Sequence, residues 1–182
     1  PQNPKTPMYL NIKTNLTIIT LIFSFLSVIS YGQDNWNSYA ISLRIISWIK
    51  IYQSVGNDFS INFKELFIKL LWIQSRFLKD NLEYDILGNH LIKNWKALQW
   101  SKCFFKTNEF DKSITLLEKY VFIQFTEDKF HEELSPMYSA IVLEDLLEVY
   151  LIDNDSVKED LIHDLFKKIN FLSFSNNYSF FN

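Results

Sequence analysis

The sequence has few residues that end helices or form tight turns. Its 182 residues include three glycines and four prolines, and the strong breakers after Pro7 are Gly32, Gly56, Gly88 and Pro136. A β-rich fold needs turn residues far more often than this, so the spacing argues against a sandwich or a barrel. The sparse breakers favour an all-α fold made of long helices.

Cysteine pairs and an excess of basic charge are also missing. The single cysteine, Cys103, forms no internal disulfide and no thiolate metal site, and we interpret it as a small buried residue. Eighteen basic and 21 acidic residues give a net charge of −3 without a basic stripe, which argues against a nucleic acid partner. No phosphate-binding loop is present and the three histidines are well separated, so we expect no metal and no other cofactor.

Hydrophobic residues make up 48% of the chain, which is too apolar for a disordered protein. An uncharged stretch at 14–33 has three open interpretations: a secretory signal over 8–32, an uncleaved membrane anchor over 14–33, or a buried first helix. We therefore divide the chain into a leader, 1–34, and a helical domain, 35–182. A signal peptide would favour a periplasmic or secreted protein, and its absence a cytoplasmic one.

Helical periodicity continues through the rest of the chain. We expect Asp111 and Asp155 to be N-caps, and Glu144, Asp145 and Glu148 to lie on a solvent-facing side of their helix. Antiparallel pairing is the economical packing for helices joined by short loops. The expected helices are 37–55, 59–81, 91–105, 111–124, 136–152 and a last one from Asp155 through Ile169.

Two polar islands, 87–94 and 131–138, coincide with the rare breakers, and sites commonly form in such places. From the residues alone, two interpretations stay open. Asn89 could cap a helix, His90 could be a hydrogen-bonded core residue and Tyr138 an interhelical tyrosine. Alternatively, these side chains form a His/Tyr/Glu site.

Three segments in this order, 36–48, 82–98 and 135–147, resemble heparinase II/III-like polysaccharide lyases, and the resemblance covers about 35–182. They contain Gly88-Asn-His-Leu91 and Ser135-Pro-Met-Tyr138. Within the family's loop motif, Asp128, His131 and Glu133 keep their places. The motif's glycines and arginine, and the histidine after Tyr138, are replaced.

The resemblance implies a partial α/α toroid and β-elimination on a uronic-acid-containing polysaccharide of heparin, heparan or alginate type. It implies that Asn89 faces the sugar carboxylate, with His90 beside Asn89 as an orienting residue or a base. Tyr138 would act as base, acid or both. His131 and Glu133 would contact substrate or the residues that do. Arg44 could bind an anionic sugar or be a surface or structural arginine. The expected partner is an acidic polysaccharide.

The resemblance further implies that the chain stops before the family's β-sandwich, which carries another catalytic histidine. We therefore expect residues 1–182 to be inactive alone. A catalytically silent glycan-binding or structural helical domain is the alternative. In that case Trp36, Trp95 and Trp100 could serve as aromatic platforms for sugars.

Overall fold

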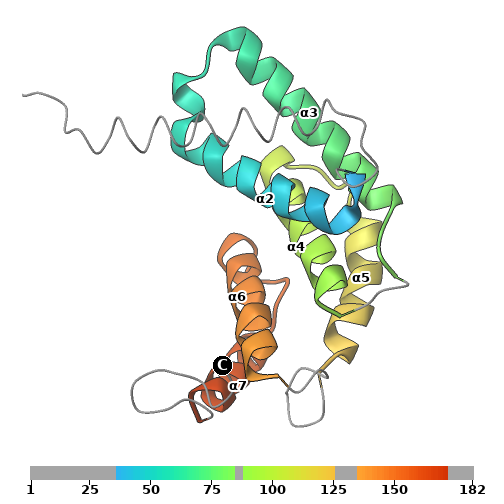
Figure 1. The fold of residues 1–182 in the computed structure, drawn as a ribbon, viewed down its shortest axis with the longest axis vertical. Coiled ribbons are helices and arrows are strands. Elements are labelled where there is room, and N and C mark those ends of the chain that lie inside the picture. The colour runs from blue at the N-terminus through green and yellow to red at the C-terminus, as the bar shows by residue number, and fades with distance from the viewer. Residues whose placement is uncertain (1–35, 85–87, 126–134, 172–182) are drawn as a thin grey trace, which may run out of the picture.

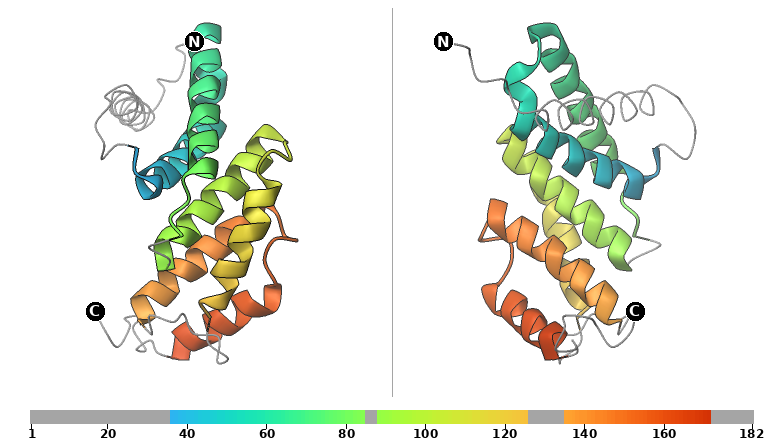
Figure 2. Two further views of the ribbon diagram at one scale, coloured as in Figure 1. Left: turned by 90° about the vertical axis from the view of Figure 1, so that its right-hand side faces the viewer. Right: turned by 60° about the vertical axis from the view of Figure 1, so that its left-hand side comes forward.

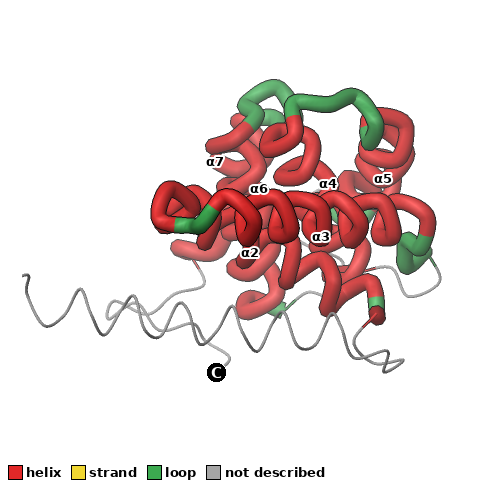
Figure 3. Tube along the Cα trace, turned by 90° about the horizontal axis from the view of Figure 1, so that it is seen from above, coloured by secondary structure: helices red, strands yellow, loops and turns green. Residues whose placement is uncertain are grey.

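The computed structural model describes residues 36–84, 88–125 and 135–171, and these ranges contain helices and no strand (Figures 1 and 3). The prediction of an all-α fold is therefore confirmed. The elements in chain order are α2 (Ser38–Val55), the short 3-10 helix η2 (Gly56–Asp58), α3 (Ile61–Asp80), α4 (Gly88–Phe105), α5 (Asp111–Ile123), α6 (Pro136–Ile152) and α7 (Glu159–Phe171).

Side-chain caps fix the starts of α2, α3 and α6. Asn37 precedes α2, and its Oδ1 accepts hydrogen bonds from the backbone N–H groups of Tyr39 and Ala40 at 2.9 and 3.2 Å. Ser135 precedes α6, where Pro136 occupies the first turn and needs no N–H partner. The predicted Ser-Pro start of α6 is confirmed.

The predicted starts of α4 and α7 were wrong by a few residues, whereas α5 begins at Asp111 as predicted but has another N-cap. Helix α4 begins at Gly88, whose φ of 54° lies in the left-handed region that glycine adopts without a Cβ clash. Asp111 is the first residue of α5 and not its cap, and its Oδ1 lies 3.0 Å from Lys102 Nζ. Asp155 lies in the turn before α7, which begins at Glu159.

Successive helices form antiparallel pairs, as predicted. In the α2–α3 pair the Ser38 hydroxyl donates to the Asn81 carbonyl at one end. At the other end the rings of Tyr52 and Phe67 stack with centroids 5.7 Å apart. In the α4–α5 pair, Gln99 reaches Glu118. Helices α6 and α7 form the third pair (Figure 1).

The first helices of the three pairs, α2, α4 and α6, form a parallel layer (Figure 2). Side chains that meet across this layer are separated by a nearly constant number of residues. Asn94 bonds to Ser42 across 52 residues, and Lys93 reaches Asp145 across 52. Repeated antiparallel pairs with parallel first helices are the geometry of a partial α/α toroid.

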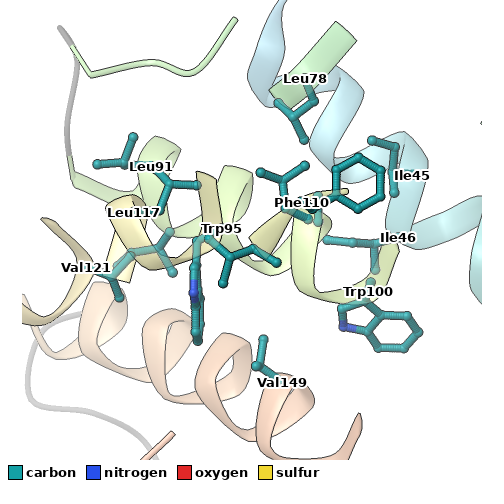
Figure 4. Packing of buried hydrophobic residues seen from close by; sticks show 14 of the residues in the cluster. Ile45, Ile46, Leu78, Leu91, Trp95, Trp100, Phe110, Leu117, Val121 and Val149 are labelled. Carbon is teal, nitrogen blue, oxygen red and sulfur yellow. The ribbon is translucent and has the colours of Figure 1, made fainter. Parts of the chain in front are cut away.

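The hydrophobic core centres on α4, which packs against α2, α3, α5 and α6. Trp95 is fully buried between α5 and α6, and Trp48 of α2 stacks on Phe67 of α3 with centroids 4.8 Å apart. Figure 4 shows side chains of α2, α3, α5 and α6 packed around those of α4, including Ile45, Ile46, Leu78, Leu91, Trp95, Trp100, Phe110, Leu117, Val121 and Val149.

Candidate functional site

Helix α4 carries polar side chains that are almost fully buried: Asn94, Lys96, Gln99 and Ser101. Buried polar groups are costly unless they are hydrogen-bonded. Each of the four bonds to a neighbouring segment, as Ser101 does with Ser75 of α3 at 2.8 Å between hydroxyl oxygens. These bonds fix how α4 sits within the layer and therefore where its N-terminal residues lie.

Ion pairs bind α4 to α6. Lys93 and Lys96 place their Nζ atoms 2.6 and 2.8 Å from Oδ1 of Asp145, and Lys96 also lies 2.8 Å from Oε2 of Glu148. Lys50 of α2 completes the network at 2.8 Å from Oε1 of Glu148. Asp145 is only 1% exposed, so its predicted place on a solvent-facing side was wrong.

The pKa values in this network follow from the pairing. Burial alone would lower the pKa of Lys96, but the carboxylates of Asp145 and Glu148 raise it above its ordinary value. Burial would likewise raise the pKa of Glu148, and Lys50 and Lys96 lower it. The pairing therefore favours the charged forms of Lys96 and Glu148.

The parallel register brings the N-terminal ends of α4 and α6 to one end of the layer. Contacts between these helices join residues 49 to 52 positions apart, from Lys93–Asp145 at one level to Cys103–Ile152 at another. Tyr138 follows Asn89 by 49 residues, and both lie in the first turn of their helices. Both sequence islands thus contribute to the same end of the fold.

Asn89 does not act as a helix cap. It is the second residue of α4, and its side-chain Oδ1 is buried without a hydrogen-bond partner among the residues that the structure describes. An unpaired buried amide oxygen costs free energy, so such a group is notable in a folded protein. In the same described ranges, the hydroxyl of Ser139, the residue after Tyr138, is also buried and has no hydrogen-bond partner.

His90 lies against Glu83, in the segment that leads into α4. Its Nδ1 is 3.4 Å from Glu83 Oε1, and its ring packs on Tyr39 with centroids 4.4 Å apart. The His90 side chain is 39% exposed and the Glu83 side chain 9%. The imidazole therefore lies at the surface over a buried carboxylate, which does not fit a simple core histidine.

Tyr138 is accessible from solvent. It lies in the first turn of α6, and it is 38% exposed. Its backbone N–H donates to the Ser135 hydroxyl, which holds the first turn in place. An exposed phenol on a capped helix start is available to a ligand, whereas an interhelical tyrosine would be buried.

The other predicted site residues are placed differently. Arg44 lies on the side of α2 that faces α3, where its Nε donates to Gln74 Oε1, and burial lowers the pKa of its guanidinium. His131 and Glu133 lie outside the described residues, as does the 1–34 leader. The substrate-binding roles of Arg44, His131 and Glu133 stay predictions.

Trp95 and Trp100 do not provide the predicted sugar platforms. Trp95 is fully buried and Trp100 is 8% exposed, so their ring faces are covered by protein. The ring of Trp36 packs edge-on against Phe77 with centroids 4.9 Å apart. The platform interpretation is therefore wrong for Trp95 and Trp100.

Sequence reasoning did not assign roles to Glu83, Tyr39 and Ser42, which surround His90 and Asn94. Two signals were available. His90 and Asn94 are four residues apart, so they lie on the same side of α4, and Glu83 stands in the same motif segment. The Ser42 contact spans 52 residues and has no local signature.

Two classes of feature are not found in the described ranges. There, no three His, Cys, Asp or Glu side chains gather in a way that could hold a metal ion. Nor is any helix in the same ranges long and apolar enough to cross a membrane. The segment 14–33 lies outside those ranges.

A family model described as heparinase II/III N-terminus matches residues 28–172. The chain belongs to this family. The match covers every helix described above, so the chain is a polysaccharide lyase-related domain. The family resemblance of the sequence motifs is confirmed.

Comparison with solved structures supports the fold. A crystal structure of a mutant of heparan sulfate lyase HepC from Pedobacter heparinus matches with a TM-score of 0.65 and 15% sequence identity. The match covers 90% of this chain and 28% of the HepC chain, so this chain spans less than a third of that protein's length. Comparison with curated proteins gave no match.

Proposed function

We propose that this chain is the helical part of a polysaccharide lyase and holds a uronic acid residue of an acidic polysaccharide at the N-terminal end of the α2–α4–α6 layer. One observation carries the proposal: the parallel register of α4 and α6 aligns the helix start that bears Asn89 and His90 with the helix start that bears the exposed Tyr138. The match to heparan sulfate lyase HepC supports an acidic polysaccharide as the substrate class.

The arrangement suits β-elimination. The Asn89 amide would donate to the sugar carboxylate and reduce its charge, which makes the neighbouring C5 proton easier to remove. A base, His90 or Tyr138, takes that proton. The electron pair of the C5–H bond then forms the C4–C5 double bond, the C4–O bond breaks, and the leaving oxygen takes a proton from Tyr138. The helix N-termini add partial positive charge at this end of the layer.

A binding experiment and a cleavage experiment test the proposal together. Titration of the labelled 182-residue chain with uronic-acid oligosaccharides should perturb the amide signals of Asn89, His90 and Tyr138. A matched neutral oligosaccharide should leave them unchanged. The unsaturated uronate product absorbs in the ultraviolet, so the chain and any longer product of its reading frame can be assayed for cleavage.

A catalytically silent glycan-binding domain is the second candidate, and the replaced residues of the loop motif at 128–139 favour it. It predicts oligosaccharide binding with no unsaturated product from any form of the protein. If the oligosaccharides change the amide signals of other residues but not those of Asn89 and Tyr138, the result would count against both candidates.

A further inference from the structure

Glu83 is a buried carboxylate held at several points. Its backbone N–H donates to Asn94 Oδ1 at 3.1 Å, and its Oε2 accepts from Asn94 Nδ2 at 3.1 Å. Asn94 Nδ2 also donates to Ser42 Oγ of α2 at 3.1 Å. One fully buried amide thus fixes both the backbone and the carboxylate of Glu83 against α4.

The second carboxylate oxygen of Glu83 points to His90. Its Oε1 lies 3.4 Å from His90 Nδ1, and among the described residues His90 is the only ion-pair partner of Glu83. An ionised carboxylate only accepts hydrogen bonds, so Nδ1 of His90 has to be the donor. A neutral imidazole with a proton on Nδ1 has an unprotonated Nε2.

The imidazole ring is restrained on a second side. Tyr39, in the first turn of α2, packs on its face with centroids 4.4 Å apart and an angle of 32° between the ring planes. Contacts on an edge and on a face restrict rotation of the ring. With Nδ1 turned to buried Glu83, the Nε2 edge lies on the opposite side of the ring.

We propose that Glu83 is a positioning residue that holds His90 in the Nδ1–H tautomer and so leaves Nε2 as a hydrogen-bond and proton acceptor for the sugar. The use of Nε2 on a sugar rests on the proposed function, whereas the tautomer does not. A carboxylate that orients an imidazole in this way is a common means of fixing a general base. Tyr138 then becomes the group that protonates the leaving oxygen.

Imidazole ¹⁵N spectroscopy of the 182-residue chain tests the tautomer directly. At alkaline pH, where imidazoles are neutral, we expect His90 to show a protonated Nδ1 and an unprotonated Nε2. His163 is exposed on α7 and serves as the internal reference for an unrestrained ring. A wild-type His90 that carries its proton mainly on Nε2 would overturn the proposal, whatever the variants do.

Two variants separate orientation from a general effect of charge. Glu83→Gln should lower the ratio of the Nδ1–H to the Nε2–H form of His90 by about tenfold, because the glutamine amide also donates to an unprotonated Nδ1. Glu109→Gln removes an exposed carboxylate that pairs with Lys79 and should leave the ratio unchanged. Equal effects of both variants would contradict the assignment.

The kinetic measurement distinguishes the two proposals. In a form of the protein that cleaves polysaccharide, Glu83→Gln should lower kcat and leave KM nearly unchanged, because substrate does not contact Glu83. An unchanged kcat would overturn the positioning role even if the tautomer shifts. If no form cleaves polysaccharide and the tautomer is as expected, the proposed function fails and the assignment of Glu83 stands.

Discussion

Lys96 of α4 and Asp145 of α6 meet with 2.8 Å between Nζ and Oδ1, although their side chains are only 5% and 2% exposed. The pair lies between two parallel helices of the layer and is joined there by Lys93 and Glu148. A buried pair of this kind adds little net stability compared with an apolar pair, but it is costly to break on one side. Its main effect is to fix the register that aligns the starts of α4 and α6.

Asp145→Asn should therefore destabilise the fold by about 3 kcal/mol, because it leaves two lysine ammonium groups without their main counter-charge. Urea unfolding followed by circular dichroism measures the change. Glu144→Gln is the matched control, since Glu144 is exposed on the same helix and should change stability by less than about 0.5 kcal/mol. Equal effects of the two variants would show that the pair does not hold the register.

The network also predicts an acid-sensitive component of stability. The pKa of Glu148 is lowered in the folded state, so its contribution is complete above the pKa of the unfolded chain. It is lost as pH falls through the lower folded value. Because Lys50 and Glu148 are partly exposed, we expect a contribution below about 1 kcal/mol.

Urea unfolding of the wild type and of Glu148→Gln over a series of pH values measures this component. The stability difference between the two proteins should shrink as pH falls below the ordinary carboxyl range, about 4.3. A difference that stays constant from neutral to acid pH would contradict the assignment. Lys96 has the opposite pH dependence. Its pKa is raised in the folded state, so its contribution to stability is lost only as pH rises through that raised value.

The helices could be predicted from local sequence because caps, breakers and apolar periodicity are local signals. Ser135-Pro136 is an example, since both residues act within one turn. The environment of Asp145 could not be predicted in the same way. Its neighbours Glu144 and Glu148 suggest a solvent-facing side, while its partners Lys93 and Lys96 lie 52 and 49 residues away. Partner choice at that distance depends on how helices stack.

The residues of the candidate site also divide into those with a local sequence signal and those that depend on distant contacts. Asn89, His90 and Tyr138 were proposed from short motifs, and the register places the two motifs at one end of the layer. Glu83 was overlooked because its importance depends on Asn94 holding it under His90. A buried carboxylate cannot be distinguished by type from an exposed one in the sequence.

In a form of the protein that cleaves polysaccharide, Tyr138→Phe should reduce cleavage by roughly 10²- to 10⁴-fold, the range for loss of a general acid or base, while oligosaccharide binding is largely retained. Tyr150→Phe is the control, because Tyr150 lies near the other end of α6. Initial rates of ultraviolet absorbance increase measure cleavage. Full activity of Tyr138→Phe would exclude the phenol from proton transfer.

Asn89→Ala should weaken binding of uronic-acid oligosaccharides to the 182-residue chain, because its amide would face the sugar carboxylate. In a form of the protein that cleaves polysaccharide, the variant should also lower kcat/KM by roughly 10²-fold or more. Comparison with a substrate analogue whose carboxylate is reduced to an alcohol isolates that contact. The variant and the wild type should bind the reduced analogue equally weakly. A constant ratio of affinities for both ligands would indicate a role unrelated to the carboxylate.

An apolar hollow of about 470 Å³ between α6 and α7 should make the 182-residue chain self-associate. Its lining combines Leu143, Leu147, Ile162 and Phe166 with Glu159, Asp160 and His163, and Phe166 is 58% exposed. Contiguous exposed apolar surface favours association between molecules, whereas isolated exposed residues do not.

Leu147→Glu with Phe166→Glu should shift sedimentation velocity profiles toward monomer at a given concentration. Ile61→Glu changes a 75% exposed residue at the start of α3 and should have no such effect. A wild-type chain that stays monomeric at high concentration would contradict the prediction, as would an effect of Ile61→Glu equal to that of the double variant.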